Sequence, residues 1–78
     1  MMKIEVFFFA AVKEALGQSV REMEVPEGTY IHEIVRLLGL EHGRNIPLIF
    51  AVNEDFETGD RKLENRDRLA IMTPMSGG

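Results

Sequence analysis

The feature that most limits the fold is one amphipathic stretch near the middle of the chain, TYIHEIVRLLGL, at residues 29–40. Its apolar side chains recur at helical spacing, at Ile31, Ile34, Val35 and Leu38. Thr29 is a typical N-cap residue and Gly39 a typical stop, so we expect a helix over Tyr30–Leu38. A single main helix of this length can cover only one face of one sheet. The sequence therefore predicts a two-layer α+β domain.

The first residues of the chain read as a strand. Residues 2–10, MKIEVFFFA, are rich in β-branched and aromatic side chains that alternate between two faces. One face carries Ile4, Val6 and Phe8. The opposite face carries Lys3, Glu5, Phe7 and Phe9. Residues 11–17, AVKEALG, then predict a helix of one or two turns that ends at Gly17.

Residues 19–25, SVREMEV, predict a second strand that pairs with the first as an antiparallel hairpin. Its apolar period slips between Val20 and Met23, so we expect a bulge or a late start there. Residues 46–53, IPLIFAVN, are almost wholly apolar, which predicts a strand buried on both faces or at the sheet centre.

Two further strands complete the pattern. A short strand is expected around Phe56, and residues 68–73, RLAIMT, predict the last strand before Pro74. In this last strand Leu69 and Ile71 face one way, and Ala70 and Met72 the other. The element order predicts a ubiquitin-like β-grasp: a mixed sheet crossed by one main helix, with a short helix after the first strand.

Length and composition limit the number of domains, the classes of partner and the location that we expect. The 78 residues allow one domain, 1–78, for which we expect a flexible C-terminal tail at 74–78. A net charge of −4 disfavours nucleic acid and anionic membrane surfaces as partners. The chain has no cysteine, no apolar run long enough to span a bilayer and no signal-peptide pattern, so we expect a cytoplasmic protein.

The side chains do not predict an active site. Six carboxylates crowd one segment, but they alternate with basic residues, which is typical of a solvated rim. These are Glu54, Asp55, Glu57, Asp60, Glu64 and Asp67. The histidines, His32 and His42, are interpreted as surface residues, because a metal site usually needs three or four ligands.

The sheet face opposite the main helix is the candidate binding surface. Phe7 and Phe9 are expected to point away from the helix, with Met72 and Phe56 beside them. An uncovered sheet face is normally polar, and an exposed apolar patch often marks a partner surface. The alternative is that the short helix, through residues 12–16, covers Phe9.

Three stretches resemble the family of molybdopterin synthase small subunits. They are FFFAAVKEALG at residues 7–17, AVN at 51–53, and LENRDRLAIMTPMSGG at 63–78. Together they follow the family's order and length over most of the chain. Two positions depart from the usual pattern, Thr73 before the proline and Met75 after it, and they leave the fit to a partner channel open.

The resemblance implies a sulfur carrier that binds no cofactor itself and acts as a non-catalytic subunit. A ubiquitin-activating-type enzyme would use ATP to adenylate the carboxylate of Gly78, next to Gly77, and a persulfide donor would convert it to a thiocarboxylate. The large synthase subunit would use that sulfur to turn cyclic pyranopterin monophosphate into molybdopterin. The partner-binding residues implied are Phe7, Phe9, Phe56, Met72, Pro74, Met75 and Ser76.

Other functions fit the same terminus. A ubiquitin-like protein modifier would join Gly78 to lysines, and carriers for thiamine synthesis or tRNA thiolation would also use a Gly-Gly end. A structural interaction domain with an incidental tail is the remaining alternative.

Overall fold

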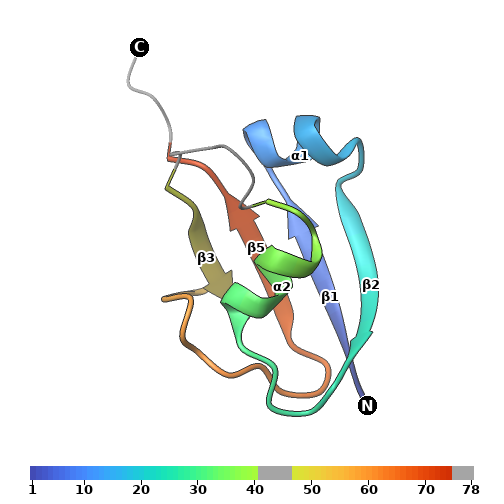
Figure 1. Cartoon of the computed structure of the whole chain (residues 1–78). Helices are drawn as coiled ribbons and strands as arrows, with labels where there is room; N and C mark the ends of the chain where they lie inside the picture. Colours follow the sequence, from blue (N-terminus) through green and yellow to red (C-terminus); the bar gives the residue numbers. More distant parts are fainter. Residues whose placement is uncertain (41–46, 75–78) are drawn as a thin grey trace.

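Five strands form one sheet in the computed structural model, which describes residues 1–40 and 47–74 (Figure 1). The strands are β1 (Met2–Phe8), β2 (Val20–Val25), β3 (Ile49–Val52), β4 (Asp55–Glu57) and β5 (Arg68–Met72). Their order across the sheet is β2-β1-β5-β3-β4. β5 runs parallel to β1, and the other neighbouring pairs are antiparallel. The predicted mixed sheet is confirmed.

Two helices accompany the sheet in the described part of the chain. α2 (Ile31–Leu37) crosses one face, and α1 (Ala10–Leu16) lies at the end of β1 (Figure 1). This arrangement is the ubiquitin-like β-grasp expected from the element order. No helix among residues 1–40 and 47–74 is long and apolar enough to cross a membrane.

The core lies between α2 and one face of the sheet. Its centre is formed by the predicted inward residues of β1, namely Ile4, Val6 and Phe8, each at most 1% exposed. The same cluster takes in residues from both helices and from β5: Val12, Ile31, Ile34, Leu69 and Ile71. The alternation in β1 and β5 therefore predicted the buried face correctly.

The start of α2 differs from the prediction. Tyr30, not Thr29, is the N-cap, and the Glu33 carboxylate accepts a hydrogen bond from the Tyr30 N–H at 3.0 Å. Thr29 is buried, and its hydroxyl donates to the carbonyl of Pro26 at 2.6 Å. The preceding turn thus uses the Thr29 hydroxyl, and the helix begins one residue later.

The end of α2 follows the prediction. Gly39 has φ of 72° and donates its N–H to the carbonyl of Arg36, while Leu40 donates to the carbonyl of Val35. These two bonds form a Schellman motif, which needs the left-handed conformation that glycine adopts without steric cost. Gly17 has φ of 69° and ends α1 in the same region of backbone space.

The expectation about β2 is wrong, and the expectation about β3 is confirmed in one of its two alternatives. β2 has no bulge and does not start after Val20: its pairing with β1 is regular from Met2↔Val25 to Phe7↔Val20. The slip in the apolar pattern arises because Val20 faces outward whereas Met23 faces inward. An inward position between them, Arg21, can be charged, because β2 is an edge strand and Arg21 reaches solvent. β3 is buried on both faces at its end, as expected, because the outward Ala51 is 8% exposed and the inward Val52 1%; the central strand of the sheet, however, is β5.

Candidate functional site

One row of apolar side chains crosses the sheet on the face that α2 does not cover. The strand register sets Phe7 opposite Val20 on one side and opposite Ala70 on the other. Ala70 stands opposite Ala51, and Ala51 opposite Phe56. The row therefore takes one residue from each of the five strands. Because opposite residues share a face, all five lie on the uncovered face.

Much of this apolar surface is open to solvent. Phe56 is 78% exposed, Phe9 49% and Val20 48%, while Phe7 is half-buried. A sheet face with water on one side usually carries polar residues there, and exposed aromatic side chains grouped in this way typically mark a partner surface.

Phe9 belongs to this surface although it follows β1. Its backbone is extended, with φ of −130° and ψ of 155°, and its N–H donates to the carbonyl of Ile71 at 3.2 Å. Phe9 therefore continues the outward set of β1 at the level of Met72. α1 turns Val12 into the core and leaves Phe9 half exposed. The alternative that the short helix covers Phe9 is wrong.

The end of β5 extends the apolar surface toward the tail. Met72 stands opposite Ile49 on β3, and both are partly buried. Pro74 is exposed and is the last described residue. Met75, Ser76, Gly77 and Gly78, which the sequence marks as partner-binding or reactive residues, lie outside the described part of the chain.

The next row toward the opposite end of the sheet is charged. Glu5 stands between Glu22 of β2 and Arg68 of β5, and its carboxylate lies 3.6 Å from the Arg68 Nε. Both side chains are well exposed, so this pair contributes little to stability. The uncovered face is thus divided into an apolar part near Pro74 and a charged part away from it.

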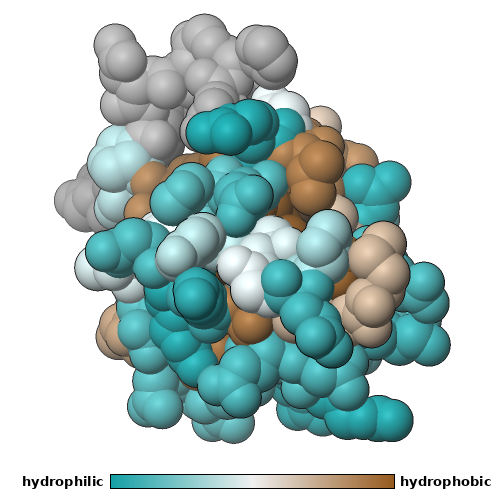
Figure 2. All heavy atoms as spheres, turned by 60° about the horizontal axis from the view of Figure 1, so that its bottom comes forward, coloured by the Kyte–Doolittle hydropathy of each residue, from teal (hydrophilic) through white to brown (hydrophobic). Residues whose placement is uncertain are grey.

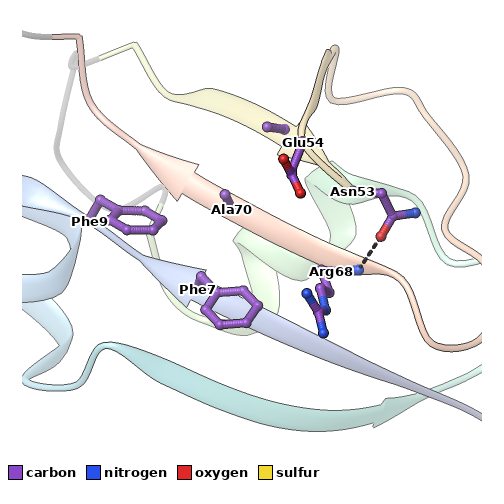
Figure 3. Close-up of a pocket in the computed structure, with 7 residues that line it drawn as sticks. Phe7, Phe9, Asn53, Glu54, Arg68 and Ala70 are labelled. Carbon is purple, nitrogen blue, oxygen red and sulfur yellow. Dashed lines mark hydrogen bonds between the residues drawn. The ribbon is translucent and has the colours of Figure 1, made fainter.

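A hollow of about 430 Å³ lies between these two parts (Figure 3). Its lining residues are Phe7, Phe9, Ala51, Asn53, Glu54, Arg68 and Ala70. Figure 3 shows the two phenylalanine rings over β1, the Ala70 side chain between them and the β3–β4 turn, and the Glu54 carboxylate reaching over the hollow. A different view, toward the β2–α2 and β4–β5 connections, shows a largely hydrophilic surface (Figure 2).

The β3–β4 turn places two polar residues at the rim. Asn53 and Glu54 have φ of 50° and 74°, as both central residues of a type I′ turn do. The Asn53 side chain accepts from the Arg68 N–H and donates to the Asp67 carboxylate, each at 3.0 Å. Asp67 is only 6% exposed, so the interpretation of all six carboxylates as a solvated rim is wrong at this residue.

The remaining titratable residues do not form a site. The Thr58 hydroxyl donates to the exposed Asp60 carboxylate and thereby lowers the pKa of that group below its ordinary value of 3.8. The exposed His32 is stacked on Tyr30, and its Nδ1 lies 2.6 Å from the Gly59 carbonyl oxygen. Among residues 1–40 and 47–74, no three potential ligands are grouped as a metal site. His42 lies outside the described residues.

Sequence reasoning identified the aromatic members of the face but not Ala51, Ala70, Glu54 and Arg68. The period-2 pattern does place Ala70 on the outward side of its strand. Which residue of β1 stands beside it depends on the parallel pairing of β1 with β5, which joins segments more than 60 positions apart. No local sequence signal specifies that register.

The chain is similar to known proteins over nearly its whole length. The ThiS family matches residues 6–78. A molybdopterin synthase sulfur carrier subunit of Arabidopsis thaliana is 29% identical over 99% of this chain and 84% of its own length. The protein of the same description from Chlamydomonas reinhardtii is 26% identical over 99% of this chain and all of its own length.

Solved structures share the fold. A putative molybdopterin converting factor subunit 1 from Pyrococcus furiosus has a TM-score of 0.78 at 22% identity, over 96% of this chain and all of its own. SAMP1 from Haloferax volcanii has a TM-score of 0.78 at 18% identity, over 97% and 99% of the two chains. A complex of subunits 1 and 2 of the molybdopterin-converting factor from Helicobacter pylori contains a chain with a TM-score of 0.66 at 20% identity, over 99% and 100%.

Proposed function

The chain belongs to the ThiS family, and from that membership we propose that it is the sulfur carrier subunit of a molybdopterin synthase. The observation that carries the proposal is similarity over 99% of the chain to two sulfur carrier subunits of molybdopterin synthase. The family match extends to residue 78, so it includes the Gly77-Gly78 pair.

In the proposed reaction, the reactive group is the carboxylate of Gly78. A carboxylate is a poor electrophile until one oxygen becomes part of a good leaving group. Attack of this carboxylate on the α-phosphorus of ATP, within an activating enzyme, releases pyrophosphate and forms an acyl-adenylate. The terminal sulfur of a persulfide then displaces AMP, and a second thiol cleaves the sulfur–sulfur bond. The products are a disulfide and the Gly78 thiocarboxylate.

In the proposed mechanism, the sheet binds the partner and the tail carries the reactive group. The apolar row supplies a binding surface, and β5 leads from the centre of that surface toward Pro74. Glycines at 77 and 78 let a backbone pass through a narrow channel where side chains would clash. No side chain of the described residues is required to act on the sulfur. The chain itself therefore needs no cofactor, and ATP is consumed at the activating enzyme.

The proposed partners are the large synthase subunit and an adenylating enzyme of the ubiquitin-activating type. The Helicobacter pylori structure, a complex of subunits 1 and 2, supports the first of these. The activating enzyme and the persulfide donor follow from the chemistry of the terminus. The substrate that receives sulfur in the large subunit is proposed to be cyclic pyranopterin monophosphate.

Intact mass spectrometry tests this proposal directly. Protein isolated from its native cell, or treated with the activating enzyme, ATP and a persulfide donor, should gain about 16 mass units, because one sulfur replaces one oxygen at the thiocarboxylate. The charged protein should then support molybdopterin formation by the large subunit. If the terminus never carries sulfur under either condition, the proposed function is wrong.

A second candidate function is protein modification through the same terminus. The observation that favours it is the fold shared with SAMP1, a small archaeal modifier protein. Modification predicts that, after trypsin digestion, lysines of other proteins carry the remnant LAIMTPMSGG, residues 69–78, because Arg68 is the last basic residue of the chain. Such remnants, found without any thiocarboxylate on the free chain, would favour modification over sulfur transfer.

A further inference from the structure

We propose that the hollow over Ala51 and Ala70 is a socket for one bulky apolar side chain of the large synthase subunit, and that a basic residue beside that side chain pairs with Glu54. This inference rests on the proposed function, because it specifies what the partner must present to the apolar row.

Side-chain size along the row creates the socket. The row runs from Val20 and Phe7 through two alanines to Phe56. Ala70 and Ala51 stand directly opposite each other on β5 and β3, so two methyl groups form the floor at the middle of the sheet. Both are outward-facing, yet their partial or complete burial shows that taller neighbours surround them. A flat partner surface would leave this hollow of about 430 Å³ unfilled.

An unfilled apolar hollow at an interface loses contacts, whereas a side chain seated in it gains them. Interface energy is concentrated where an aromatic or large aliphatic anchor fills a pocket near the centre of the contact. The socket meets that description, because β5 and β3 lie inside the sheet with other strands on both sides. Phe7 and Phe9 line the β1 side, where an aromatic anchor would meet two rings (Figure 3).

The negative charge beside the socket favours a basic residue next to the anchor in the partner. Glu54 is exposed, and the described residues provide no hydrogen bond or ion pair to its carboxylate. The cation among the lining residues, Arg68, already lies 3.6 Å from the Glu5 carboxylate. The outward charges of β1, β2 and β5 with the β3–β4 turn are four carboxylates and two cations: Glu5, Glu22, Glu24, Glu54, Lys3 and Arg68. A partner with a lysine or arginine beside its anchor complements this surface.

The test is the affinity of the full-length chain for the purified large subunit. Ala70→Leu fills the socket and should weaken binding by at least about tenfold, as for loss of one anchor contact. Ala15→Leu makes the same change at an exposed position of α1, and Leu37→Phe adds bulk at an exposed position of α2; both positions lie outside the row. Each of these two controls should change the affinity by less than about threefold. Thermal unfolding of every variant checks that the fold is kept.

Glu54→Gln tests the charge separately. It should slow association at low salt and reduce the dependence of the association rate on ionic strength, because the attraction it removes acts at long range. Glu54→Asp keeps the charge and should retain most of that dependence.

The outcomes separate this inference from the proposed function. If Ala70→Leu binds as well as the wild type, or if Ala15→Leu weakens binding equally, the socket is wrong while sulfur transfer can still stand. If the wild-type chain does not bind the large subunit at all, the socket and the proposed partner are both wrong. Failure of the proposed function itself is seen independently, as absence of the thiocarboxylate by mass.

Discussion

The side-chain amide of Asn53 donates a hydrogen bond, at 3.0 Å, to the buried carboxylate of Asp67. The other Asp67 oxygen accepts from the Glu64 N–H at 2.7 Å, and the Asn53 backbone N–H donates to the Arg68 carbonyl at 2.9 Å. The β3–β4 turn is thereby fixed to the start of β5, next to the hollow. Two polar residues far apart in the sequence thus hold the rim of the candidate site in place.

We expect Asp67→Ala to destabilise the protein by about 2–3 kcal/mol, because it leaves the Asn53 amide and the Glu64 N–H without an acceptor. The free energy of unfolding in urea measures this effect. Asp55→Ala changes an exposed carboxylate in the same segment and should stay within about 0.5 kcal/mol of wild type. Equal effects for the two variants would show that the buried network does not stabilise this turn.

Glu54→Gly should stabilise the fold by about 0.5–1 kcal/mol, because Glu54 holds a φ of 74° that costs an L-residue free energy and costs glycine little. The adjacent Asp55 begins β4, so Asp55→Gly should instead destabilise by a similar amount. Urea unfolding of both variants gives the comparison. A destabilised Glu54→Gly variant would mean that the strain at this turn is compensated by contacts of the Glu54 side chain.

Two adjacent phenylalanines provide a matched test of the binding face. Phe9 is 49% exposed on the uncovered side, whereas Phe8 is 1% exposed in the core. Phe9→Ala should weaken binding to the large subunit by about 2 kcal/mol or more and leave the fold intact. Phe8→Ala should cost about 3–5 kcal/mol of stability. Calorimetry measures the affinity of each variant for the large subunit, and thermal unfolding measures its stability. A Phe9→Ala variant that unfolds would show that Phe9 belongs to the core.

The pKa of Asp60 gives a prediction about a single hydrogen bond. The Thr58 hydroxyl is the main cause of its lowered pKa, with help from a backbone hydrogen bond and the charge of His32. Thr58→Val should therefore raise this pKa toward 3.8, while Thr58→Ser should keep it low. Because the pKa of Asp60 is lower in the folded state than in the unfolded state, it stabilises the fold at pH values above the unfolded-state pKa. This contribution is lost as the pH falls through the folded-state pKa. A carboxyl NMR titration measures the shift, and an unchanged pKa in Thr58→Val would exclude the hydroxyl as its cause.

The fold was largely predictable because its signals are local. Alternation assigned Ile4, Val6 and Phe8 to the core, and helical spacing assigned Ile31 and Ile34 to the same core. The N-cap was misplaced at Thr29, because a hydroxyl next to a turn can serve the turn instead of the helix. The hydropathy of β3 correctly indicates burial on both faces, at Ala51 and Val52, but it does not tell which strand is central, because strand order is set by long-range pairing.

The candidate site was predictable only in part, for the same reason. Phe7, Phe9 and Phe56 stand out by size in the sequence. Ala51 and Ala70 do not, and they acquire meaning only when β3 and β5 are set side by side. Asp67 could not be told from its acidic neighbours, since its burial depends on a hydrogen bond from Asn53, 14 positions away.

The last prediction concerns the terminus and follows from the proposed function. Deleting Gly78 would shift the carboxylate by about 3.5 Å, the length of one extended residue. Attack geometry tolerates far less, because the reacting atoms must lie about 3–3.5 Å apart and aligned. The deletion, Gly77→Val and an added residue after Gly78 should all abolish thiocarboxylate formation, while the thermal stability stays near wild type, as is usual for changes at a chain end. His32→Ala, His42→Ala and Glu54→Ala should leave thiocarboxylate formation near normal, because no side chain takes part in the proposed reaction. Mass spectrometry after activation, followed by the molybdopterin assay with the large subunit, measures both steps. A chain without Gly78 that still accepts sulfur and supports molybdopterin formation would overturn the assignment of the reactive group.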